Sequence, residues 1–101
     1  MSMLHTVNKS PFEKESMKSC LRLSAEGSSI LLIEDGIYAA MVDTTISDSV
    51  KEAMKSKKIY ALKEDVNARG VQNKLMDGIE QIDYAGFVDL VTQHDKVQSW
   101  V

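Results

Sequence analysis

The only cysteine of the chain, Cys20, carries the side chain best suited to covalent chemistry. A thiolate can attack the outer sulfur of a persulfide, whereas a buried cysteine behaves as a small apolar residue. Cys20 stands about three turns into a helix predicted to start near Ser10, beyond the reach of the helix dipole. Lys18 and Arg22 lie on another face of that helix. The residues favour a core position for Cys20, and a reactive thiol stays the alternative.

Three acidic segments are the other candidates for chemistry: "EDG" at 34–36, "KED" at 63–65 and "DYAG" at 83–86. Each follows a predicted strand, and parallel sheets bind ligands beyond the carboxyl ends of their strands. The chain contains no glycine-rich nucleotide loop, no nucleophile elbow and no close histidine pair. We therefore predict no metal site and no cofactor.

Five further residues have structural explanations that outweigh catalysis. His5 is expected to be a hydrogen-bonded strand residue, and His94 a residue favoured by the dipole at a helix C-terminus. Asp35 is expected to cap or solvate a loop, and Arg69 to close a turn or contact a partner. Trp100 is expected to belong to a tail docked on the core or on a neighbouring chain.

Four short apolar runs, at 3–7, 29–34, 58–62 and 79–83, alternate with segments of helical pattern. This order predicts βαβ units, hence a three-layer α/β/α fold with a mostly parallel sheet of four or five strands. The second run is apolar almost throughout and is expected to be central, whereas the fourth is expected nearer an edge. One domain spanning residues 1–101 accounts for this length.

The helices that position these strands are predicted from capping signals. Ser10, with Pro11 and Glu13, is predicted to start the first helix and Gly27 to end it. Further helices are expected at about 47–55 and 84–94, with a short one in "EDVNARG". The third long helix is predicted to turn three residues inward: Phe87, Val88 and Val91. So few helices do not cover both faces of a sheet, which predicts oligomerisation.

Composition limits the possible partners. Hydrophobic residues make up 44% and charged residues 27%, as in ordinary folded proteins, and the formal net charge is −3. This charge gives no general attraction for nucleic acid. No apolar run approaches the roughly 20 residues of a membrane span, and no secretory signal is present. We expect a cytoplasmic protein without direct nucleic-acid or membrane partners.

Four segments carry a family resemblance: "MLHTVNKSPFE", "ILLIEDGIYAA", "YALKEDVNARG" and "IDYAGFVDLVTQHDKVQSW". In order and spacing they resemble the DsrH/TusB family of intracellular sulfur-relay proteins. The resemblance covers nearly the whole chain and implies a DsrEFH-like α/β domain. It also implies two homologous partner subunits, of the DsrE/TusD and DsrF/TusC types, in a dimer of heterotrimers.

The family has two branches, and both pass persulfide sulfur. The resemblance implies either cytoplasmic sulfur oxidation, with DsrC and reverse dissimilatory sulfite reductase, or 2-thiolation of the tRNA wobble uridine. A cysteine at the place of Cys20 resembles DsrH-type members, which favours sulfur oxidation and a DsrC/TusE-like acceptor. It also makes Cys20 a candidate sulfur-carrying or redox thiol. The main sulfur-carrying cysteine resembles one on the DsrE/TusD subunit, so this chain is expected to be a non-autonomous component, and a purely structural subunit is the alternative.

Overall fold

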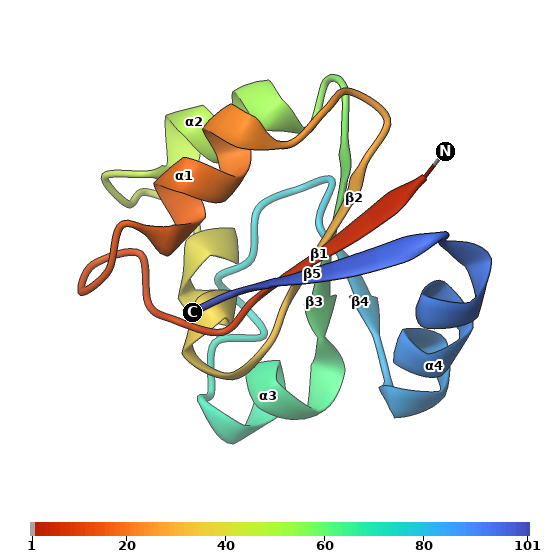
Figure 1. The fold of residues 1–101 in the computed structure, drawn as a ribbon. Helices are drawn as coiled ribbons and strands as arrows, with labels where there is room; N and C mark the ends of the chain where they lie inside the picture. The colour runs from red at the N-terminus through yellow and green to blue at the C-terminus, as the bar shows by residue number, and fades with distance from the viewer. Residues whose placement is uncertain (1) are drawn as a thin grey trace.

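The computed structural model describes residues 2–101 as one five-stranded sheet with helices on both faces (Figure 1). All strand pairs are parallel, in the order β4-β3-β2-β1-β5. The predicted α/β fold with a parallel sheet is therefore confirmed. The strands are β1 (Met3–Val7), β2 (Ser29–Leu32), β3 (Lys58–Leu62), β4 (Glu80–Ile82) and β5 (Lys96–Trp100). The helices are α1 (Ser16–Leu23), the 3-10 helix η1 (Glu34–Ala40), α2 (Ser47–Ala53), α3 (Lys63–Ala68) and α4 (Tyr84–Gln93).

The central position of β2 follows from its composition. All four residues of "SILL" are buried, as a strand covered on both faces requires. The more polar β4 lies at one edge of the sheet, as predicted. The other edge is β5, which the apolar pattern did not predict because four of its five residues are exposed. It pairs with β1 from Met3 opposite Lys96 to Val7 opposite Trp100.

The two faces of the sheet are covered unequally. On one face, α1, α2 and η1 enclose the larger core, which includes Val7, Met17, Ile30 and Val50. On the other face α4 covers a small cluster of four buried residues: Leu4, Leu31, Tyr60 and Leu90. One ten-residue helix spans only part of a five-stranded sheet, as the sequence led us to expect.

The predicted start of the first helix is wrong. Ser10 accepts a hydrogen bond from the Phe12 amide at 3.2 Å, but residues 11–13 form only a turn, and α1 begins at Ser16. The backbone carbonyl of Ser10 accepts from the Glu13 and Lys14 amides, so the capping signal produces a local turn and not a helix. The helix also ends earlier than predicted, at Leu23, and Gly27 (φ +84°) lies in the following turn.

The predicted inward face of α4 is also partly wrong. Val88 and Val91 are 62% and 40% exposed, and Leu90 is the buried residue of this helix. The helix packs on the sheet through Leu90 and the half-buried Phe87. Its apolar residues occupy more of the helix surface than this contact covers, so some of them stay exposed. None of the helices within residues 2–101 has the length and apolar character needed to cross a membrane.

Candidate functional site

The turn after β2 brings three strand ends together. Gly36 lies against β1, where an added Cβ would stand 2.0 Å from the carbonyl oxygen of Val7. Two residues earlier, Glu34 has a φ of +50°, a left-handed conformation that is unfavourable for a residue with a side chain. The "EDG" segment therefore needs a glycine for close approach and external contacts to hold Glu34.

Asp65 and Arg69, both from the region of α3, supply those contacts. An Asp65 carboxylate oxygen accepts the Glu34 amide hydrogen at 2.6 Å. Arg69 donates to Asp35 Oδ1 from Nε at 3.0 Å and places a second guanidinium nitrogen 2.9 Å from the same oxygen. A third Arg69 nitrogen lies 3.7 Å from Asp65. We call Glu34, Asp35, Asp65 and Arg69 the carboxyl-edge network. Its arginine pairs with its two aspartate carboxylates, which indicates a structural role.

The third acidic segment also serves local structure. Asp83 is the N-cap of α4, and its side chain accepts the Gly86 amide hydrogen at 2.9 Å. The Tyr84 amide donates to Glu64 at 3.4 Å, which joins the starts of α4 and α3. Each of the three acidic segments therefore follows a strand, as predicted, but their described contacts are capping bonds and ion pairs. Among residues 2–101, no three potential metal ligands gather in one place.

Cys20 lies within the core and has no exposed surface. It packs in the same cluster as Met17, Val7 and Ile30. Burial raises the pKa of the Cys20 thiol to about 12, although the nearby Lys57 ammonium acts in the opposite direction. In this conformation the side chain is a protonated thiol without access to a reaction partner.

His94 ends α4 and ties that helix to the central strand. Its Nδ1 lies 2.6 Å from the Leu90 carbonyl oxygen, and its Nε2 lies 3.0 Å from Ser29 Oγ. Because a carbonyl can only accept, Nδ1 carries the proton, and in the neutral ring Nε2 accepts from the serine hydroxyl. His94 therefore has a structural role at a helix C-terminus, consistent with its predicted position.

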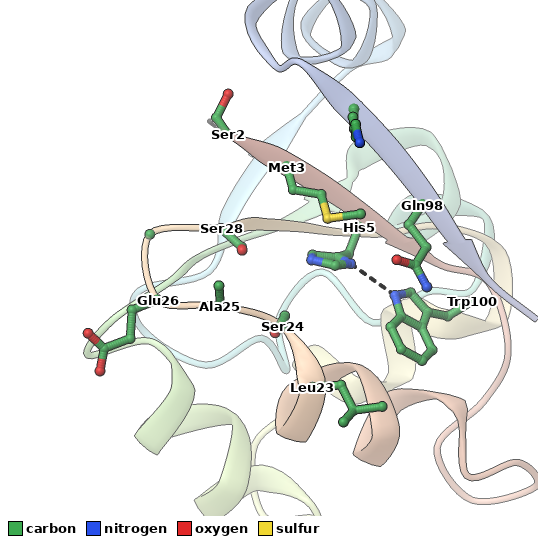
Figure 2. A pocket seen from close by; sticks show the side chains of 12 residues that line it. Ser2, Met3, His5, Leu23, Ser24, Ala25, Glu26, Ser28, Gln98 and Trp100 are labelled. Carbon is green, nitrogen blue, oxygen red and sulfur yellow. Dashed lines mark hydrogen bonds between the residues drawn. The ribbon is translucent and has the colours of Figure 1, made fainter.

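His5 and Trp100 form a second pair that sequence reasoning did not connect. The indole Nε1 of Trp100 donates to His5 Nδ1 at 3.0 Å, and the two rings lie 6.0 Å apart between centroids. Figure 2 shows both rings at a cavity bounded by β1, β5 and the segment from Leu23 to Ser28. The cavity has a volume of about 540 Å³. The apolar pattern of the sequence predicted no strand at 96–100. Because the pairing of β1 with β5 places Trp100 beside β1, that missing strand is the reason why the two residues were not connected.

Comparisons with known proteins agree with this fold. The family described as DsrH like protein matches residues 9–97. The protein named TusB from Shigella flexneri is 38% identical over 98 residues, which are 97% of this chain and all of that protein. TusB of Escherichia coli O81 (strain ED1a) is equally similar over the same shares.

Solved structures support the fold alone, because their sequence identities are low. The ychN protein from E. coli has a TM-score of 0.86 at 20% identity, with 98% of each chain covered. MTH1491 from Methanobacterium thermoautotrophicum has a TM-score of 0.76 at 15% identity, with 96% of this chain and 97% of that chain covered. The match over residues 9–97 and the 38% identity to TusB over its full length place the chain in the DsrH/TusB family.

Proposed function

We propose that this chain is a non-autonomous subunit of a persulfide-relay complex that serves 2-thiolation of the tRNA wobble uridine. The observation that carries the proposal is its 38% identity to TusB over the full length of that protein. The first-helix cysteine favoured the sulfur-oxidation branch, but the curated relatives bear the TusB name and support the thiolation alternative better. The DsrC-linked oxidation reading is therefore the weaker one.

The described chemistry of the chain supports a dependence on other subunits. Its one thiol is buried and protonated, and its acidic segments are occupied by capping bonds and ion pairs. A persulfide relay needs a thiolate that can reach the outer sulfur of its donor. In the proposed complex, a DsrE/TusD-like subunit supplies that thiolate, a DsrF/TusC-like subunit completes the heterotrimer, and a DsrC/TusE-like protein accepts the sulfur.

An exposed apolar stripe on α4 is the surface that we assign to a homologous subunit. Tyr84, Val88 and Val91, which we call the α4 stripe, recur at the spacing that places side chains on one side of a helix. Val97 on the adjoining face of β5 is also exposed. These apolar side chains lie on the face of the sheet that only α4 and the small cluster beneath it cover. A homologous α/β subunit would supply the missing cover.

Co-expression with the two homologous subunits tests this assembly. Val88→Glu places a charge in the α4 stripe, whereas the control Gln93→Glu adds the same charge to the same helix roughly 140° away. We expect the first variant to co-purify at least about tenfold less partner and the control to behave as the parent chain. Equal recovery of partner subunits by the parent chain and by both variants would show that the α4 stripe is not part of the interface. Failure of the parent chain to co-purify with either homologue would overturn the proposed function.

The burial of Cys20 favours a second candidate function, a purely structural subunit with no sulfur chemistry. Sulfur transfer through Cys20 stays a prediction, and it requires the complex to expose the thiol and lower its pKa. In this step the Cys20 thiolate attacks the outer persulfide sulfur, a new S–S bond forms as the donor's S–S bond breaks, and the donor leaves as a thiol.

Mass spectrometry of the assembled complex after exposure to a persulfide donor distinguishes the two. A gain of one sulfur atom on Cys20, together with impaired relay in a Cys20→Ser complex, supports the carrier role. An unmodified Cys20 and full relay activity in the variant support the structural role.

A further inference from the structure

The wall of the cavity between β1, β5 and residues 23–28 includes a buried donor without a partner. His5 is only 3% exposed. An indole nitrogen can only donate, so the bond from Trp100 fixes His5 Nδ1 as the acceptor and leaves the proton of the neutral ring on Nε2. Within residues 2–101 this Nε2 has no hydrogen-bond partner. Burial and the positive charge of Lys57 lower the pKa of His5, which keeps the ring neutral.

A second unsatisfied group lines the same cavity. Ser24 Oγ is buried and has no partner among the described residues. Native proteins pair nearly all their buried polar side-chain atoms with protein groups, ordered water or a ligand, so two unpaired groups beside one cavity point to a partner from outside this chain. A neutral imidazole N–H is a donor, and a serine hydroxyl can donate as well. The group that satisfies both is therefore a hydrogen-bond acceptor.

The charges around the cavity favour an acidic group. Lys96 lines it, and the Lys57 ammonium acts on His5 from nearby. The acidic lining residue, Glu26, extends away from the His5 ring (Figure 2). The positive charge of Lys96 in the lining therefore favours an anionic acceptor, with a more distant contribution from Lys57, and no carboxylate is directed at the ring.

The remaining walls set the character of the rest of the ligand. Met3, Leu23 and the Trp100 indole contribute apolar surface. A volume of about 540 Å³ lies within the range of about 300–1,000 Å³ that is typical of small-molecule sites. A single acceptor group on an apolar body matches both the polar and the apolar lining.

We propose that this cavity binds a small organic carboxylate, with its carboxylate on His5 Nε2 and Ser24 Oγ and its apolar body against Trp100 and Leu23. The segment 23–28 forms one wall of the cavity, and its residues Ala25, Glu26 and Gly27 are exposed. Because both polar atoms are buried, binding of the carboxylate requires part of this segment to move aside. The proposal is independent of the relay function.

Titration of the isotope-labelled full chain, followed by NMR, tests the proposal. Phenylacetate, butyrate and indole-3-acetate are the probes, and phenylacetamide is the uncharged counterpart of the first. We expect saturable shifts of residues 24–28, of β5 and of the His5 ring nitrogens with at least one acid, and binding about tenfold weaker for the amide. Absence of saturable shifts with all three acids up to about 10 mM would overturn the proposal.

Variants separate this site from unspecific binding of an anion. Ser24→Ala removes one of the two polar groups, and Lys96→Met removes a lining charge. Lys63→Met, at the opposite end of the sheet in α3, is the matched control for loss of a charge. We expect the first two variants to weaken binding about tenfold each while the control binds as the parent chain does. Equal affinity in all four proteins, each checked for folding by its amide spectrum, would also overturn the assignment.

Discussion

Treatment of the isolated chain with DTNB, an aromatic disulfide, measures how strongly the fold suppresses the reactivity of Cys20. Burial raises the pKa of this thiol from 9.0 to about 12, which reduces the thiolate population about a thousandfold near neutral pH. The thiolate that remains is more basic and is therefore a better nucleophile. With a Brønsted coefficient near 0.45, this increase in pKa raises the intrinsic rate constant of the thiolate about twentyfold. Protonation alone therefore slows the reaction about fiftyfold.

Steric exclusion adds to this effect, because the Cys20 side chain has no exposed surface. The assay compares the rate of colour release by the native chain with the rate in guanidinium, at one pH. We expect the native rate to be at least about fiftyfold lower. The matched control moves the thiol along the same helix: Leu23→Cys in a Cys20→Ala background. Leu23 is 64% exposed, so this variant should react at nearly the unfolded rate.

A native rate for Cys20 within about threefold of the unfolded rate would refute the reasoning, provided that the chain is folded by circular dichroism. That outcome would mean that the thiol is accessible in solution and ionises near its ordinary pKa. It would also strengthen the carrier role over the structural role. A slow native reaction that becomes fast in the assembled complex would locate the activation in the partner subunits.

Three further predictions concern the framework. Gly36→Ala should destabilise the chain by at least about 3 kcal/mol in urea unfolding, because its Cβ would meet the Val7 backbone; an unchanged midpoint would contradict this close approach. Asp35→Asn removes one partner of a partly exposed arginine and should cost about 0.5–1 kcal/mol in the same assay, with the loss shrinking at high salt. His5 has a lowered pKa in the folded state, so the unfolded chain takes up the proton first as the pH falls below 6.5, and stability should decrease there by at most about 1.4 kcal/mol per pH unit. His5→Gln should flatten this part of the profile, and an unchanged profile would exclude His5 as its source.

The sequence alone determined the class of the fold. The apolar runs at 3–7, 29–34, 58–62 and 79–83 became the four strands β1 to β4, and the helices α2 and α4 lie close to their predicted ranges. These features depend on local periodicity and on short capping signals. Asp83 caps α4 from within its own segment, for example, so no distant residue is needed to place that helix.

Tertiary structure decided what local patterns could not. The polar segment "KVQSW" is a strand because β1, more than 90 residues away, offers it a parallel edge. The same pairing brings Trp100 to His5 and creates their cavity. Arg69 meets Asp35 only because β2 and β3 are neighbours.

Whether Cys20 is buried or reachable was likewise decided by packing. The sequence favoured a core position for Cys20 and left a reactive thiol as the alternative, and the position of α1 over the sheet then enclosed the thiol completely. The sequence specifies which residues can ionise or react. Long-range packing specifies which of them meet solvent, because desolvation and access depend on neighbours that are remote along the chain.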